Sequence, residues 1–168
     1  MERWYLASHK PGRGNAFKSQ LFLSQLGISV FIPQICKMQP RTDRPGHARK
    51  VVEPLFPGYI FIFFDYEQQQ ISKVECCPGV NKLVRFGGIL RPLNDNIVDE
   101  ILMLTTTIGH EPPECHDKKI NISYGNNNAC KALIKKQCQQ IRAIANELDG
   151  EKRSSLFYAF MDALDNNH

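Results

Sequence analysis

The strongest constraint on the fold is a run of six apolar, mostly aromatic residues, Tyr59-Ile-Phe-Ile-Phe-Phe64. β-Branched and aromatic side chains favour a strand, and successive side chains of a strand point to opposite faces of the sheet. Tyr59, Phe61 and Phe63 therefore point to one face, and the residues that alternate with them point to the other. Because both faces are apolar, we expect a central strand with core helices on one side. The other side needs a second cover, which can be further helices, a protein partner or stacked bases.

The segments around this run predict an antiparallel sheet flanked by helices, which is an α+β fold. Further strands are expected at Arg3–Lys10, Ile28–Met38 and Val80–Phe86, and Pro33 indicates an edge or a bulge in the second of them. Helices are expected at Asn15–Leu26, from Asp65 as the N-cap to about Cys76, and at Asp95–Thr105. The basic segment Pro40–Lys50 indicates an exposed loop or the tip of a hairpin.

The chain is expected to divide into a domain at residues 1–105, a linker at 106–128 and a helical hairpin at 129–168. The linker is rich in Gly, Pro and Asn, with a short extended piece expected at Ile120–Tyr124. Beyond it, two apolar stripes at helical spacing flank a break at Asp149-Gly150. The first stripe consists of Ile134, Cys138, Ile141, Ala145 and Leu148. The second stripe consists of Leu156, Phe157, Phe160, Met161 and Leu164. Such a hairpin has too little core to be stable alone, so its apolar face should dock on the first domain or on a partner.

Positive charge is concentrated in the N-terminal third. Residues 1–50 carry nine basic and two acidic side chains, whereas residues 51–109 carry four and seven and residues 110–168 carry eight of each. Lys10, Arg13 and Lys18 flank the start of a helix, where backbone N–H groups favour anions. With the basic residues of the 40–50 segment (Arg41, Arg44, Arg49 and Lys50) they can line a groove for nucleic acid. The alternative is a solvated basic surface.

Motifs of enzymes and metal sites are missing from the sequence. It contains no Gly-x-Ser-x-Gly, no Walker loop and no His-Glu-x-x-His. His110, Cys115 and His116 lie close together, but no fourth ligand has suitable spacing. We therefore expect no catalytic residue, no metal and no cofactor. With no signal peptide and no apolar run long enough for a membrane helix, we expect a cytoplasmic protein with free thiols.

The aromatic strand also allows an RNA-binding alternative. Gly58-Tyr-Ile-Phe-Ile-Phe-Phe64 loosely matches the aromatic strand of an RNA-recognition motif, and the β-α-β-β-α-β order is the same. In that interpretation Tyr59, Phe61 and Phe63 form a platform on which bases stack.

Four short motifs in order resemble a known family. They are Trp4-Tyr5-Leu6, Glu53-Pro-Leu-Phe-Pro-Gly-Tyr-Ile-Phe61, Pro78-Gly-Val80 and Val84-Arg-Phe-Gly87. Together they resemble the N-terminal domain of the NusG family of transcription elongation factors. Within that family, the Glu-Pro-Leu-Phe-Pro segment and the closing Asp149-Gly-Glu-Lys-Arg-Ser154 are similar to the specialised RfaH-like antiterminators. The resemblance covers about residues 1–104 and returns at about 141–164.

The resemblance implies a factor that suppresses pausing and termination by binding. An apolar patch containing Tyr59, Phe61 and Phe86 would bind the clamp helices of the RNA polymerase β′ subunit. A basic face formed by Lys10, Arg13, Lys18 and Lys73 would contact the non-template DNA strand. The C-terminal hairpin would cover the polymerase site and so autoinhibit a factor that we expect to be a monomer.

The resemblance also implies how the hairpin is held. Glu53 would form an interdomain salt bridge with Arg153, beside the apolar interdomain residues Ile141, Leu148, Leu156, Phe157 and Phe160. Treated as an exposed pair, this bridge is worth only about 0–1 kcal/mol. Exchanging the two charges is then expected to restore part of the closure that Arg153→Glu removes.

Two departures from the family pattern bear on partners. The tripeptide aligned with the polar motif that contacts the polymerase β gate loop is Gln70-Ile71-Ser72, so that second contact stays open. The Gly-rich signature of a C-terminal β-barrel is not evident between Gly125 and Gly150, where the pattern is helical. We therefore do not expect refolding to a barrel or recruitment of a ribosome.

Overall fold

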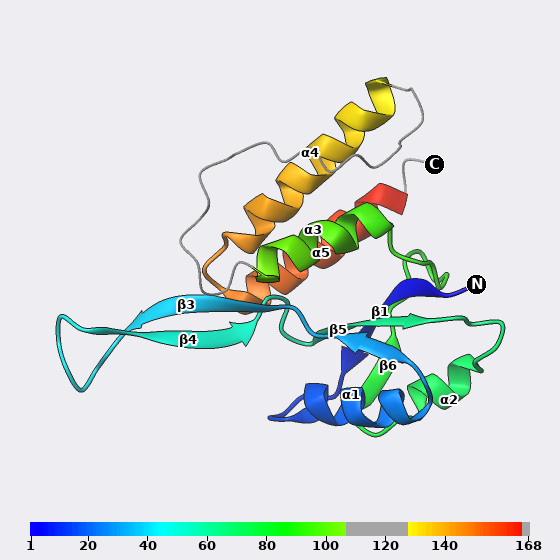
Figure 1. Ribbon diagram of the computed structural model, residues 1–168, viewed down its shortest axis with the longest axis horizontal. Helices are drawn as coiled ribbons and strands as arrows, with labels where there is room; N and C mark the ends of the chain where they lie inside the picture. Colours follow the sequence, from blue (N-terminus) through cyan, green and yellow to red (C-terminus); the bar gives the residue numbers. More distant parts are fainter. Residues whose placement is uncertain (107–127, 166–168) are drawn as a thin grey trace.

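The computed structural model describes residues 1–106 and 128–165, and the predicted linker with its candidate ligands His110, Cys115 and His116 lies almost wholly outside them. An antiparallel sheet with the strand order β2-β5-β1-β6 forms the centre of the molecule (Figure 1). Its strands are β1 (Arg3–His9), β2 (Ser29–Phe31), β5 (Tyr59–Phe64) and β6 (Val80–Leu83). The apolar run is thus an inner strand, paired with β1 from Ser8↔Tyr59 to Arg3↔Phe64 and with β2 on its other edge. The α+β prediction is confirmed.

Strand β5 buries side chains on both faces, as its sequence predicts. Ile60, Ile62 and Phe64 lie in a core cluster with α1 and α2, whereas Phe61 lies in a second cluster with α3, α4 and α5. Figure 1 shows these two groups of helices on opposite sides of the sheet. The helices are α1 (Asn15–Gln25), α2 (Ile71–Glu75), α3 (Asp95–Thr106), α4 (Asn128–Ala145) and α5 (Gly150–Asp165). The second cover of β5 is therefore helical.

Helices α4 and α5 share the core of the sheet. Ile141 of α4 and Phe157 of α5 are fully buried in the cluster that contains Phe61. Asp149 caps α5, because its Oδ1 accepts a hydrogen bond from the Lys152 backbone N–H at 3.0 Å. The break predicted at Asp149-Gly150 thus lies at the start of the second helix, and the predicted pair of helices is confirmed.

Pro33 has a larger effect than the predicted edge or bulge. The expected strand Ile28–Met38 is wrong as a single element, since it divides into β2 and β3 (Gln34–Pro40) around Pro33. Pro33 has no N–H for a ladder, and its carbonyl instead accepts from the Leu55 N–H at 2.7 Å. Strand β4 (Ala48–Pro54) was not predicted; it pairs with β3 in a separate two-stranded sheet. The segment Pro40–Lys50 contains the tip of this hairpin.

Two smaller predictions are corrected. Asp65 does not cap a helix, because α2 begins only at Ile71. The Asp65 carboxylate instead accepts a hydrogen bond from the Glu67 backbone N–H at 3.0 Å and pairs with the N-terminal ammonium of Met1. Strand β6 ends at Leu83 rather than Phe86, and Phe86 instead forms an isolated bridge with Ile89 across a glycine turn.

A close approach at Gly79 generates a stability prediction. Gly79 has a φ of +89°, and an added Cβ would lie 2.7 Å from the Asn15 carbonyl oxygen and 2.7 Å from Ser19 Oγ in α1. Gly88 has a similar φ of +81° but nothing within 4 Å of such a Cβ. Both alanine substitutions strain the backbone, but only Gly79→Ala overpacks. We expect Gly79→Ala to lower the free energy of unfolding by about 1–3 kcal/mol more than Gly88→Ala, measured by urea denaturation. Equal losses would contradict the clash.

Candidate functional site

The most distinctive surface is the aromatic face of the sheet that α5 covers. Phe61 of β5 and Phe86 are buried, whereas Tyr59 at the start of β5 is partly exposed. The Phe157 ring stacks on Phe56 with centroids 4.2 Å apart and lies 5.8 Å from the Phe61 ring. The next residue, Tyr158, covers Phe86 at a centroid distance of 5.5 Å. Two consecutive side chains of α5 thus close over this aromatic face.

The cover is incomplete at Tyr59. A cavity of about 300 Å³ lies beside it, lined by Ser8, Tyr59, Lys82, Leu83, Val84, Arg85 and Tyr158. Burial and the neighbouring Tyr158 raise the pKa of Tyr59, so its phenol is neutral at physiological pH. The rim of the aromatic face is therefore open to a partner while Phe61 and Phe86 are covered.

Arg153 is the main polar anchor of α5. Its side chain is 0% exposed, and its Nη2 lies 2.6 Å from Glu53 Oε1. Nη2 also donates to the Pro54 carbonyl at 3.3 Å, and Nε and Nη1 donate to the carbonyls of Leu55 at 2.8 Å, Glu147 at 2.8 Å and Leu148 at 3.2 Å, which lie on both sides of the contact. Treating the Glu53–Arg153 pair as an exposed salt bridge is therefore wrong, because the guanidinium is removed from water and bound by a cage of carbonyl groups.

Glu53 is shared between two cations. Its Oε1 also lies 2.9 Å from Lys37 Nζ, and Lys37 in turn donates to the Leu148 carbonyl. Burial raises the pKa of Glu53, but the hydrogen bonds from Lys37 and Arg153 outweigh burial and hold this pKa below its ordinary value. The carboxylate is thus charged at neutral pH, as both ion pairs require.

Three contacts of the C-terminal helices were not anticipated from the sequence. Ser154 Oγ donates to the Pro57 carbonyl at 2.8 Å, and an added Cβ at Gly150 would lie 2.8 Å from Pro57 Cγ. On α3, the almost fully buried carboxylate of Glu100 pairs with Arg142 of α4. A polar residue on an otherwise apolar helix face is the one signal that could have indicated Glu100.

The predicted interdomain residues divide into two groups. Ile141, Phe157 and Phe160 lie in or against the shared core cluster. Leu148 is 82% exposed and Leu156 is 41% exposed, so neither belongs to the buried contact. Leu148 lies in the turn between the helices, where its carbonyl rather than its side chain makes contacts. Leu156 precedes Phe157 by one residue, which rotates it about 100° away from the buried face of α5.

The basic residues lie at the opposite side of the sheet. Lys10, Arg13 and Lys18 are exposed around the end of β1 and the first turn of α1, and Lys73 is exposed on α2. The turn is fixed by a hydrogen bond from the Lys10 N–H to the Gly79 carbonyl at 2.7 Å. Three of the four predicted nucleic-acid-binding residues are thus brought to one end of α1, with Lys73 on a separate helix of the same layer.

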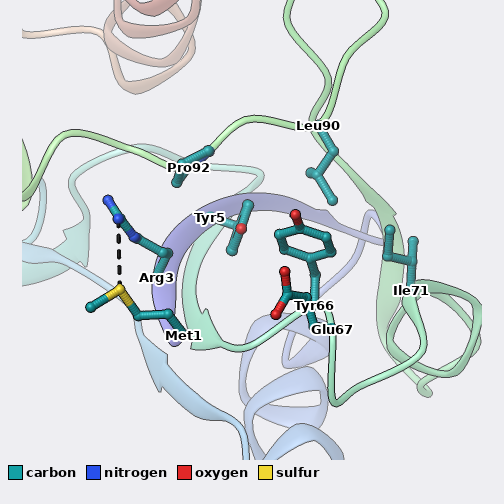
Figure 2. Close-up of a pocket in the computed structure, with 8 residues that line it drawn as sticks. All are labelled: Met1, Arg3, Tyr5, Tyr66, Glu67, Ile71, Leu90 and Pro92. Atoms are coloured by element: carbon teal, nitrogen blue, oxygen red, sulfur yellow. Dashed lines mark hydrogen bonds between the residues drawn. The ribbon is translucent and has the colours of Figure 1, made fainter.

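A second cavity, of about 530 Å³, lies where β1 begins. Its lining consists of Met1, Arg3, Tyr5, Tyr66, Glu67, Ile71, Leu90 and Pro92. Figure 2 shows Tyr5 and Tyr66 at its centre, with Arg3 towards one end and Ile71 at the other. The two tyrosine rings meet nearly edge to face, with centroids 6.4 Å apart. The cavity is mainly aromatic and aliphatic and includes Ile71 of the tripeptide Gln70-Ile71-Ser72.

The arrangement gives little support to the RNA-binding alternative. Phe61 lies under α5, and the Phe63 ring packs on Trp4 with centroids 5.1 Å apart, so the expected stacking platform is not open.

Within residues 1–106 and 128–165, no cluster of three or more His, Cys, Asp or Glu side chains is suited to a metal ion. None of the helices in this part of the chain combines the length and apolar character needed to cross a bilayer.

Comparison with known proteins agrees with the resemblance of the N-terminal part. A family model described as "Transcription termination factor nusG" matches residues 2–102. Among solved structures, one described as "Domain interaction in Thermotoga maritima NusG" is similar at 23% sequence identity and a TM-score of 0.43, over 76% of this chain and 68% of that one. The family model covers more than half of the sequence. The chain therefore belongs to the NusG family, whose members are transcription factors.

Proposed function

We propose that this chain is an elongation and antitermination factor of the RfaH-like type, autoinhibited by α4 and α5. The observation that carries the proposal is the contact of Phe157 and Tyr158 with the aromatic face, because α5 lies outside the segment that the family model matches. In this proposal residues 1–105 form the polymerase-binding domain, residues 106–128 the linker and residues 129–168 the masking hairpin. Chemistry by a cofactor has no part in it.

The polymerase-binding surface would be Tyr59, Phe61 and Phe86, and its partner the clamp helices of the β′ subunit. An aromatic face of this kind suits the apolar side of a helical partner. Since α5 is itself a helix lying on this face, it would mimic and exclude that partner. The open rim at Tyr59 offers the polymerase a first contact before α5 leaves.

Two further contacts complete the proposal. Lys10, Arg13, Lys18 and Lys73 would bind the phosphates of the non-template strand, where charge rather than base-edge contacts supplies affinity. The cavity between Tyr66 and Ile71 would receive the β gate loop through apolar contacts, in place of the polar motif of RfaH-like relatives. Recruitment of a ribosome and a barrel form of the C-terminal part are not proposed.

The polymerase surface is tested with Tyr59→Ala in an Arg153→Ala background, in which we expect a larger open population of the hairpin. Loss of this aromatic contact from the proposed interface should weaken binding to RNA polymerase by about ten-fold or more. Leu21→Ala on α1, an exposed apolar residue of the opposite layer, serves as the control and should leave binding unchanged. Unchanged polymerase binding combined with lost affinity for free RNA would instead favour the RNA-binding alternative.

Removing the Arg153 side chain should open the hairpin. Arg153→Ala leaves the Glu53 carboxylate and several carbonyl groups without their donor, which costs about 2 kcal/mol or more and so raises the open population about 30-fold. Hydrogen exchange of the α5 amides measures this change. Lys152→Ala removes a neighbouring exposed cation and should have little effect.

The exchange of the two charges gives a second test. Because four acceptors of Arg153 are carbonyls, Glu53→Arg should not restore the closure that Arg153→Glu removes. A substantial restoration of closure would contradict the carbonyl cage.

Closure should also depend on pH through Glu53. A carboxyl whose pKa is lowered in the closed state stabilises that state above its ordinary pKa, and this contribution is lost as pH falls through the lowered value. The hairpin should therefore loosen in the acidic range below the ordinary glutamate value of 4.5. Protection of the α5 amides from hydrogen exchange, followed against pH, measures the loss. Glu53→Gln should already be looser at neutral pH and should show a smaller acid transition; an identical transition would assign the effect to other carboxyls.

A further inference from the structure

The β3–β4 arm, defined as residues 34–54, stands apart from the rest of the fold. Its two strands form a sheet of their own, and in Figure 1 they extend beyond the helices to a free tip. Side chains 38–40 and 42–50 are all exposed, so the outer part of the arm has no core of its own. An isolated two-stranded hairpin is only marginally stable. The position of the arm therefore depends on contacts at its root, defined as residues 34–37 and 51–54.

One face of the root is turned towards the helical hairpin of α4 and α5. In the strand register Ile35 lies opposite Glu53, and Lys37 is two residues from Ile35, so these three side chains share one face of the ribbon. Ile35 packs against the core cluster that contains Phe157 of α5. Val52, which points to the other face, is 55% exposed. The root is thus held from one side only.

Lys37 ties this face to the turn between α4 and α5. Its Nζ lies 2.9 Å from Glu53 Oε1 on the neighbouring strand and also donates a hydrogen bond to the Leu148 carbonyl in the turn. The same carboxylate oxygen of Glu53 lies 2.6 Å from Arg153 Nη2 of α5. Lys37 therefore joins both strands of the arm to the hairpin, and it positions Glu53 for Arg153.

Displacement of the root breaks these contacts together. If β3 moves away from the turn, Lys37 leaves the Leu148 carbonyl and Glu53 loses one of its two cations. If β4 moves, Glu53 leaves the fully buried Arg153, and a buried charge without its partner is costly. In the opposite direction, departure of α5 removes Arg153 and the turn from the root. The contact of β3 with α3 then keeps the arm attached to the first domain.

We propose that the root of the β3–β4 arm and the hairpin of α4 and α5 open as one unit, with Lys37 as the positioning residue that links them. Closure then fixes the arm in one orientation, and opening frees it. Such coupling is reciprocal, so a partner that holds the arm in another orientation favours the open hairpin by the same factor by which opening favours that partner. The inference rests on the proposed autoinhibition, but it concerns the arm rather than the surface that binds polymerase.

The test follows amide hydrogen exchange of the full-length chain in two segments, the arm root and α5. Lys37→Met keeps a side chain of similar length and removes its charge and its hydrogen bonds. We expect exchange to accelerate about three- to ten-fold in both segments, which is the loss of these hydrogen bonds expressed as a rate. Lys50→Met, on the exposed outer part of the same arm, is the matched control and should leave both segments unchanged.

A change on α5 tests the link from the other side. Tyr158 covers Phe86, and Tyr158→Ala is expected to accelerate exchange in α5 about ten-fold. If the two segments open as one unit, the arm root should accelerate by the same factor. Acceleration confined to one of the two segments, in Lys37→Met or in Tyr158→Ala, would overturn the proposal.

The pH profile separates positioning of Glu53 from simple support of the fold. Burial raises the pKa of Glu53, but the facing cations Lys37 and Arg153 outweigh burial and lower it. Removal of one cation raises this pKa, so Lys37→Met should move the acid loosening of α5 to higher pH. An unmoved midpoint would contradict the positioning role. None of these measurements uses polymerase, so failure of the coupling is distinguishable from failure of the proposed function.

Discussion

The structure depends on the need to cover both faces of one apolar strand. Exposure of either apolar face of β5 to water is unfavourable, and two helical layers cover the two faces. One layer, α1 and α2, comes from the segment matched by the family model. The other includes α5, which reaches Phe61 from far along the sequence through Phe157. A cover supplied by a distant segment can be removed without breaking the sheet, and this property makes masking physically possible.

The polar contacts decide how such a cover can be released. Arg153 satisfies carbonyl groups on both sides of the contact while its guanidinium is kept from water. Glu53 links this cage to Lys37 of β3, and Glu100 makes an independent pair with Arg142. In the proposed opening these groups would be hydrated together, because a half-open state would leave buried donors or acceptors without partners. The closed and open states are therefore expected to be separated by a cooperative transition.

Local sequence patterns were sufficient to predict the strands and helices whose apolar residues recur at a regular spacing. The alternation in β5 and the helical stripes of α4 and α5 predicted both faces of the sheet and the helical pair. Patterns did not reveal the division at Pro33 or the polar strand β4, since a ribbon with exposed sides has no apolar alternation. They also placed Leu148 on a buried face, because periodicity does not locate where a helix ends. The Glu53–Arg153 pair came from resemblance, and only the three-dimensional packing reveals its burial.

The central claim is that α5 masks the surface that binds RNA polymerase. The most direct measurement compares the affinity for polymerase of the full chain with that of residues 1–105, after circular dichroism has established that the shorter chain keeps its sheet. Masking predicts that residues 1–105 bind about ten-fold or more tightly, since no closed state competes with the partner. Equal affinities, or weaker binding by the shorter chain, would contradict the account.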